Sequence, residues 1–130
     1  MGGADTLFGG DGNDLLIGDF RAINGPAALG LPGNDSIDGG LGADVIAGDY
    51  IDITLTLVGA ALAAANDTIV GGDGIDTIYG DAKTGNASLV DAGAGFADTI
   101  NGAAGTADTA QAGPGTDTCT NVETTTGCEP

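Results

Sequence analysis

Aliphatic residues recur along the chain two positions after an aspartate. This unit occurs in two interleaved series. Successive side chains of a β-strand point to opposite faces, so a single apolar position behind each aspartate predicts a very short strand with one inward side chain. The inward positions are Leu7, Ile37, Ile69, Ile100 and Cys119 in one series, and Leu16, Ile46, Ile78 and Ala110 in the other. We expect these residues to form two facing ladders in a core.

The aspartates themselves form two matching sets, the Asp5 column and the Asp14 column. The Asp5 column comprises Asp5, Asp35, Asp67, Asp98 and Asp117, and the Asp14 column comprises Asp14, Asp44, Asp76 and Asp108. Three members of the Asp14 column belong to the nonapeptide G-G-x-G-x-D-x-U-x, where U is a large aliphatic residue, at positions 9–17, 39–47 and 71–79. The three copies follow one another at a nearly constant interval, and each is followed by Gly-Asp.

Glycine at the first, second and fourth positions of this repeat permits backbone angles that other residues avoid, so six residues can form a tight turn. A degraded copy begins at Gly102, and a near-complete copy spans 112–120 with Ala112 in place of the first glycine. Two half-turns would then make one coil. The sequence therefore predicts an all-β fold, a parallel β-solenoid of about four coils over residues 1–120.

Every second half-turn is lengthened, and the three long half-turns at 18–38, 48–70 and 80–101 are similar in length. Within the second of these, apolar and polar residues alternate from Tyr50 to Val58, which predicts a one-faced strand. The equivalent segments are looser, with Gly25-Pro26 and Gly85-Asn86 as expected turns. Two interpretations stay open: these segments widen the core, or they form a surface for partners or self-association.

The composition of the chain excludes several classes of function. The chain has 19 acidic residues, all Asp except Glu123 and Glu129, against 2 basic residues, and its net charge is −17. Such a chain should not bind nucleic acid or anionic membranes, which require clustered Lys and Arg. It has no histidine, and no apolar stretch long enough for a membrane helix. One Lys, one Arg and two Ser offer no nucleophile–base pair, so we expect no enzyme.

Stacked coils would bring like charges together. At a coil spacing of about 4.8 Å, neighbouring aspartates of one column repel by about 1 kcal/mol in water and by about 3.5 kcal/mol at an effective dielectric of 20. A divalent cation in each gap would convert this repulsion into bonding. Calcium suits Asp carboxylates combined with backbone carbonyls. The two columns leave room for several Ca²⁺ ions, up to about seven.

The candidate calcium ligands are both aspartate columns together with carbonyls of the glycine-rich turns. Asp11 and Asp73 would offer only their carbonyl oxygens. Asp19, Asp49 and Asp81 are either additional ligands or Asx-turns. The alternative is a metal-free solenoid in which Asp and Gly only form turns. The carbonyl candidates lie at Gly9, Asp11, Gly39, Leu41, Gly71 and Asp73.

The nonapeptide resembles the repeats-in-toxin (RTX), or hemolysin-type, calcium-binding repeat, and by its register the resemblance covers most of residues 1–120. It implies a calcium-binding β-roll, secretion as a loose chain and folding on contact with calcium outside the cell. The lengthened half-turns depart from the plain family pattern.

The two cysteines, Cys119 and Cys128, lie close together near the end of the chain. They form either a disulfide that clips residues 121–130 over the last coil as a cap, with Val122 as a plug, or two free thiols. A disulfide would favour an extracellular or cell-surface location.

Two kinds of function follow from these features. The first is an extracellular calcium-binding structural module. The second is a self-assembling homo-oligomer or filament that stacks coil on coil, because the first coil has no cap.

Overall fold

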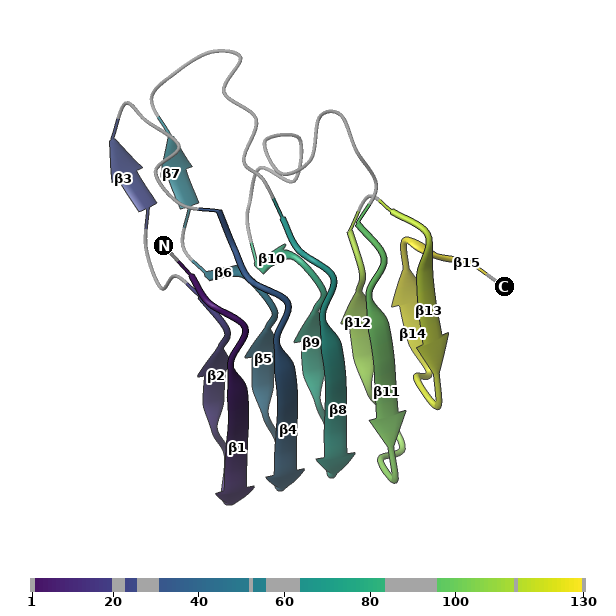
Figure 1. Cartoon of the computed structure of the whole chain (residues 1–130). Coiled ribbons are helices and arrows are strands. Elements are labelled where there is room, and N and C mark those ends of the chain that lie inside the picture. Colours follow the sequence, from purple (N-terminus) through teal and green to yellow (C-terminus); the bar gives the residue numbers. More distant parts are fainter. Residues whose placement is uncertain are drawn as a thin grey trace.

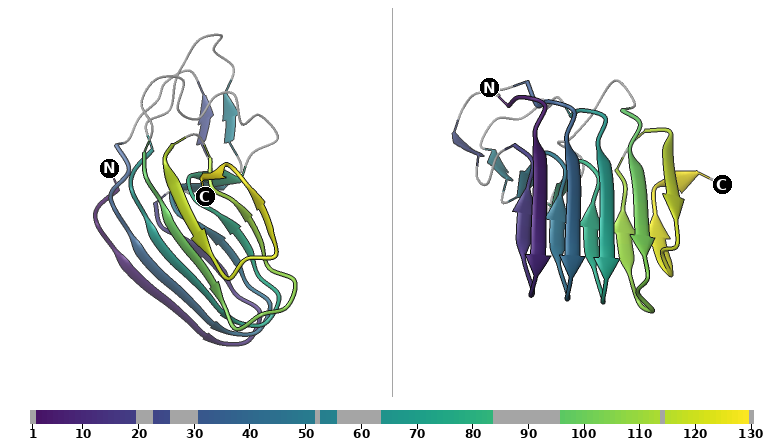
Figure 2. Two further views of the ribbon diagram at one scale, coloured as in Figure 1. Left: turned by 90° about the vertical axis from the view of Figure 1, so that its right-hand side faces the viewer. Right: turned by 60° about the horizontal axis from the view of Figure 1, so that its bottom comes forward.

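Two parallel β-sheets face each other in the computed structural model of the chain, which describes residues 2–19, 23–25, 31–51, 53–55, 64–83, 96–113 and 115–129. The strands stack coil upon coil from the N-terminal to the C-terminal end, as Figure 1 and Figure 2 show. The predicted all-β parallel solenoid is thereby confirmed. No helix in the described ranges is long and apolar enough to cross a membrane.

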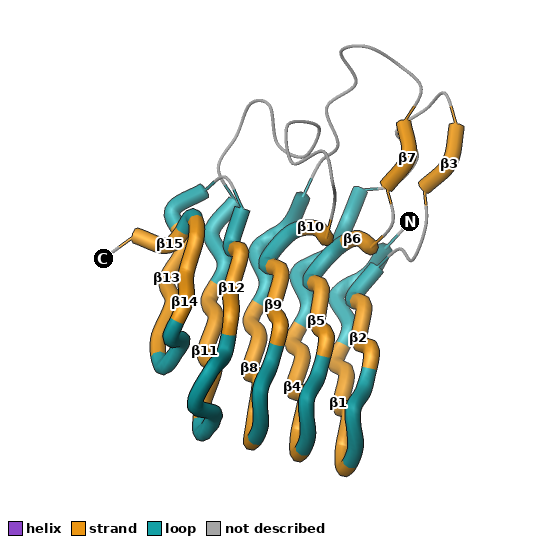
Figure 3. The backbone as a smooth tube through the Cα atoms, turned by 180° about the vertical axis from the view of Figure 1, so that it is seen from behind, coloured by secondary structure: helices purple, strands orange, loops and turns teal. Residues whose placement is uncertain are grey.

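The larger sheet has six strands in the order β1-β4-β8-β11-β13-β15, and the smaller has five in the order β14-β12-β9-β5-β2. Each coil contributes one strand to each sheet, and turns join the strands at two opposite corners of the coil (Figure 3). The larger sheet consists of β1 (Thr6–Asp11), β4 (Ser36–Leu41), β8 (Thr68–Asp73), β11 (Thr99–Ala103), β13 (Asp117–Thr120) and β15 (Cys128–Glu129). The smaller sheet consists of β2 (Leu15–Ile17), β5 (Val45–Ala47), β9 (Thr77–Tyr79), β12 (Thr109–Gln111) and β14 (Thr124–Thr126).

Both predicted ladders of inward residues are confirmed by the strand register. In the larger sheet Leu7 pairs with Ile37, and the ladder continues through Ile69 and Ile100 to Cys119. In the smaller sheet Leu16, Ile46, Ile78 and Ala110 pair in the same way. Members of both ladders pack in one hydrophobic cluster between the sheets. This core is thin, because each short strand supplies a single inward side chain.

Strands β1, β4, β8 and β11 of the larger sheet are longer than the short strand expected after each aspartate. They continue into the glycine-rich turns, where Gly10 pairs with Gly40 and Gly40 with Gly72. The turn backbones of neighbouring coils therefore extend the parallel ladder. Sequence reasoning missed this because the turn residues have no apolar pattern.

The three glycines of each turn do not all serve the same purpose. The second and fourth glycines have positive φ, for example 102° at Gly40 and 131° at Gly42, as expected. The first glycine does not, so the prediction of special backbone angles was wrong there. A Cβ atom on Gly39 would meet the carbonyl oxygen of Gly71 and the carboxylate of Asp44. The first glycine is thus required for space rather than conformation.

The degraded fourth copy shows the cost of losing a glycine. Ala103 pairs with Gly72 at the second turn position and has a φ of 69°. A non-glycine residue in this left-handed region costs about 1–2 kcal/mol. The fourth coil therefore has a more strained turn than the three before it.

The lengthened half-turns contain additional strands that pair between coils. In the segment predicted as one strand from Tyr50, the structure has β6 (Tyr50–Ile51) and β7 (Ile53–Leu55). β6 pairs with β10 (Ala82–Lys83), and β7 pairs with β3 (Ile23–Gly25). The expected turns at Pro26 and at Gly85-Asn86, and the end of the predicted strand at Leu57-Val58, lie outside the described residues.

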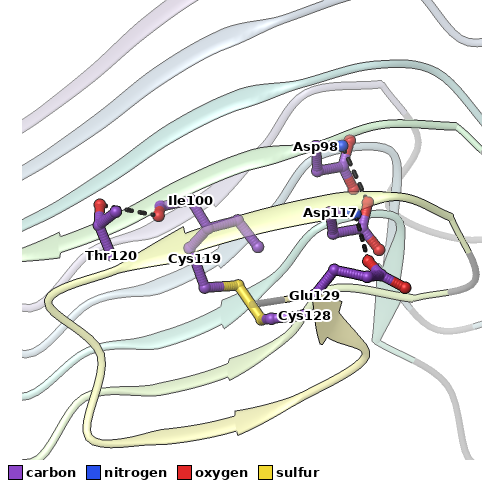
Figure 4. Close-up of a disulfide and its surroundings, with 7 residues drawn as sticks. All are labelled: Asp98, Ile100, Asp117, Cys119, Thr120, Cys128 and Glu129. Atoms are coloured by element: carbon purple, nitrogen blue, oxygen red, sulfur yellow. Dashed lines mark hydrogen bonds between the residues drawn. A yellow bond between two sulfur atoms is a disulfide. The ribbon is translucent and has the colours of Figure 1, made fainter.

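The last residues continue both sheets. β14 pairs with β12 and β15 with β13, while Val122 packs against the core. Cys119 and Cys128 form a disulfide with a Cα–Cα distance of 5.7 Å (Figure 4). The disulfide alternative is thus the one found, and it joins β13 to β15 at the end of the solenoid.

Candidate metal centre

The aspartates of both columns lie where a strand begins, so the columns run along two corners of the solenoid. Within a column, one carboxylate oxygen accepts a hydrogen bond from the backbone N–H of the aspartate in the preceding coil. Asp14 donates to Asp44 Oδ1 at 2.8 Å, and Asp44 donates to Asp76 Oδ1 at 2.9 Å. Asp35 and Asp67 are joined in the same way at 2.8 Å. Half of each such carboxylate is therefore used to join neighbouring coils.

Both glutamates of the chain end these columns, which sequence reasoning missed. The N–H of Asp108 donates to Glu123 Oε2 at 2.8 Å, and that of Asp117 donates to Glu129 Oε2 at 2.7 Å. Figure 4 shows Glu129 following Asp98 and Asp117 in line. In the sequence, Glu123 stands directly before Thr124 and Thr125, just as each aspartate stands directly before its strand. This position could have identified Glu123 as the end of a column.

The second carboxylate oxygen is the chemically unusual one. In the Asp14 column it is buried and has no hydrogen-bond partner at any of the four aspartates. Asp44 and Asp76 are each only 1% exposed. Buried ionised oxygens without partners are strongly unfavourable, and they are normally paired or bound to a metal. The free oxygens are Asp14 Oδ2, Asp44 Oδ2, Asp76 Oδ2 and Asp108 Oδ2.

In the complete repeats these oxygens lie against the first glycine of their own turn. A Cβ atom added to Gly39 or Gly71 would collide with the carboxylate of Asp44 or Asp76 and would approach a carbonyl oxygen of the next coil. Carboxylate and carbonyl oxygens from adjacent coils therefore face the same small space. These are the oxygen types that Ca²⁺ prefers, so the residues present fit the ion.

The other corner repeats this arrangement despite the lengthened half-turns. Asp35 Oδ2 and Asp67 Oδ2 are buried without a hydrogen-bond partner and lie against Gly18 and Gly48, respectively. The carbonyl oxygen of Gly80 also faces Gly48. Sequence reasoning did not assign a role to these glycines, although the recurring Gly-Asp pair after each nonapeptide marked them.

The glycine-rich turns contain further candidate ligands from the sequence. Asp11 and Asp73 have exposed side chains, and the carbonyls of Leu41 and Asp73 accept hydrogen bonds of 2.7 Å from Gly12 and Gly42. No group of three or more carboxylates that would hold a metal by itself occurs among the described residues. A cation site here must therefore combine one or two carboxylates with backbone carbonyls.

The side chains of Asp19 and Asp49 make hydrogen bonds to residues distant in the sequence. Asp19 Oδ2 accepts from the N–H of Gly33 at 2.8 Å, and Asp49 Oδ2 accepts from that of Ala65 at 3.0 Å. These bonds join the two ends of a lengthened half-turn. Asp81 stacks on Asp49, whose N–H donates to the Asp81 carbonyl at 2.9 Å. The two ends of each of these lengthened segments are thus held together by a hydrogen bond where the segment meets the solenoid.

Burial raises the pKa of several of these carboxyls. Desolvation is the largest cause at each, and neighbouring aspartates add to it. It raises the pKa of Asp35 to about 6 and the pKa values of Asp67 and Asp98 to about 7. The pKa of Asp49 rises to about 9, where Asp67 is the charged neighbour with the largest effect. Without a cation, this corner favours protonated carboxyls.

We predict that the calcium-free protein is more stable at pH 5 than at pH 8. The folded pKa values lie above the unfolded value of 3.8, so the folded chain holds more protons and loses stability as pH rises from about 4 to about 9. With calcium the trend should reverse, because ligands must be deprotonated. Urea unfolding followed by circular dichroism at both pH values, with and without calcium, checks this. Calcium-free stability that increases with pH would contradict it.

Comparison with known proteins agrees with this geometry. The family model of the RTX calcium-binding nonapeptide repeat (4 copies) matches residues 1–20, 28–49 and 63–82. The matched segments contain the three complete nonapeptides, and also Gly18 and Gly48, which lie against Asp35 Oδ2 and Asp67 Oδ2. No curated protein and no solved structure matches the chain.

Proposed function

Since residues 1–20, 28–49 and 63–82 are RTX calcium-binding nonapeptide repeats, we propose that the chain is an extracellular structural β-roll that folds on binding calcium. One observation carries this proposal. Coil after coil, a buried carboxylate oxygen without a hydrogen-bond partner faces a backbone carbonyl oxygen across a glycine. Repeats of this family bind calcium and are not catalytic, so the module acts through its structure.

The ligands that we assign are the second carboxylate oxygens of the Asp14 and Asp5 columns, together with carbonyls of the adjoining turns. The gaps between aspartates accommodate up to about seven ions. Glu123 and Glu129 extend each column by one carboxylate, but both side chains are exposed. We expect the gaps next to them to bind calcium more weakly, because water competes for the ion there.

The extracellular location is supported by the disulfide between Cys119 and Cys128, because such bonds persist in oxidising surroundings. Proteins with RTX repeats are typically secreted. Millimolar calcium outside the cell would supply the ions on which folding depends.

Isothermal titration of calcium into the calcium-stripped protein tests the proposal. We expect several ions to bind per chain. Magnesium should fail to replace calcium, because it demands near-octahedral geometry and keeps its water ligands. Uptake of no calcium, or equal uptake of both ions, would contradict the proposed function.

A second candidate function is self-assembly into a filament or surface layer. Among the described strands, β1 and β2 are the outer strands of the two sheets. Phe8 and Leu15 on these strands are 74% and 52% exposed. Unpaired edge strands are templates for pairing with another chain. Electron microscopy at millimolar calcium should then show stacks that lengthen with protein concentration, whereas discrete particles at every concentration would exclude this candidate.

A further inference from the structure

The corner that carries the lengthened half-turns has more buried carboxylates than the opposite corner. Asp49 and Asp67 stand at the two ends of one lengthened half-turn, and they are 0% and 1% exposed. The two ends are held together because Asp49 Oδ2 accepts the N–H of Ala65, which lies just before Asp67 in the chain. Two acidic side chains are thus brought to one place in the fold, although the whole lengthened segment separates them in the sequence.

One oxygen of each carboxylate remains available. Asp67 uses Oδ1 to accept the N–H of Asp35, which leaves Oδ2 buried without a partner. Asp49 uses Oδ2 for Ala65, which leaves Oδ1 buried without a partner. Asp67 Oδ2 lies against Gly48, the residue before Asp49, and the Gly80 carbonyl oxygen faces the same glycine. The corner therefore presents two carboxyl oxygens without hydrogen-bond partners and a carbonyl oxygen.

This corner also lacks the turn that supplies carbonyl oxygens elsewhere. At the opposite corner the sequence Gly-Gly-x-Gly separates the first glycine from its aspartate. Here Gly48 is followed directly by Asp49 and then by the lengthened segment. A cation in this position has fewer turn carbonyls within reach, and it needs another negatively charged ligand from the chain.

We propose that Asp49 and Asp67 together bind one Ca²⁺ ion, at a two-carboxylate site that the nonapeptide pattern does not describe. Two carboxylates from the ends of one half-turn would neutralise the ion, whereas an ion at the opposite corner would lie between aspartates and turn carbonyls of neighbouring coils. Asp19 and Asp35 repeat the arrangement one coil earlier, since Asp19 Oδ2 accepts from Gly33 and Asp35 Oδ2 lies against Gly18. This inference rests on the proposed calcium-binding function and adds a second class of site to it.

The competing explanation is that Asp49 only ties the half-turn closed through Ala65. The substitution Asp49→Asn separates the two roles, because an amide oxygen still accepts that hydrogen bond but carries no charge. Native mass spectrometry of the calcium-loaded chain counts the ions. We expect Asp49→Asn to bind at least one ion fewer than the unsubstituted chain. Asp38→Asn, in which the altered side chain lies on the outer side of β4, should bind the same number.

Terbium luminescence provides a second measurement that leaves the carboxylates unchanged. Tb³⁺ takes oxygen ligands as Ca²⁺ does, and a nearby tyrosine transfers excitation to it over a short range. Tyr50 follows Asp49 directly and is 0% exposed, and the chain contains two tyrosines and no tryptophan. We expect Tyr50→Phe and Asp49→Asn each to lose most of the emission excited through tyrosine. Asp38→Asn, which alters a side chain that is not assigned as a ligand, should keep most of it.

The outcomes separate this inference from the proposed function. If the unsubstituted chain takes up no calcium, the proposed function itself fails. If it takes up calcium and Asp49→Asn binds an equal number of ions, only the two-carboxylate site is overturned. Should Asp49→Asn not fold, the tyrosine variant decides, because unchanged terbium emission in Tyr50→Phe would mean that no ion lies beside Asp49.

Discussion

Removal of calcium at neutral pH is expected to unfold most of the β-roll. Without the ion, the free oxygens of the Asp14 column and of Asp35, Asp67 and Asp98 are buried with neither a hydrogen bond nor a metal, which costs several kcal/mol at each ionised site. The core offers little to offset this, because each strand contributes one inward side chain. Metal binding free energy is folding free energy where no preformed site exists.

Circular dichroism with and without a chelator measures this effect. The chelated protein should lose its β signal, and excess calcium should restore it. The disulfide between Cys119 and Cys128 remains in both states, so it cannot account for a difference. A chelated protein that keeps its β signal at neutral pH would show that the solenoid is metal-free, with Asp and Gly acting only as turn residues.

Substitution of Asp44 by alanine is expected to have the largest effect of any single change in the Asp14 column. Asp44 lies in the middle of that column and accepts the Asp14 N–H at 2.8 Å. Loss of this acceptor costs about 1–3 kcal/mol. Loss of the calcium ligand adds to that, so a higher calcium concentration should be needed for half-maximal folding.

Two further variants make this measurement specific. Asp44→Asn keeps an oxygen acceptor for Asp14 but removes the charge, so it isolates the contribution of the ligand. Asp38→Ala changes an aspartate on the outer side of β4 and should alter stability by no more than about 0.5 kcal/mol. Equal calcium midpoints for Asp44→Ala and Asp38→Ala would disprove the assignment of Asp44 as a ligand.

Much of the solenoid was predictable because the chain repeats itself. A nearly constant repeat length places equivalent positions side by side in neighbouring coils, so one local pattern determines the strand pairing. Ile37, Ile69 and Ile100 therefore lie in register as expected. The same periodicity predicts that Asp14, Asp44 and Asp76 lie one above the other in neighbouring coils. In an ordinary globular fold such contacts are not readable from a single sequence.

The two ladders, the two aspartate columns and the pairing of coils all follow from the periodicity of the sequence. The three-dimensional arrangement was needed to show which oxygen of each carboxylate stays free, why the first glycine is required, and how each column ends at a glutamate. It also decided that Asp49 reaches Ala65 across a lengthened half-turn. These contacts depend on the close approach of backbones from adjacent coils, or on segments of unequal length, and no periodic pattern encodes either.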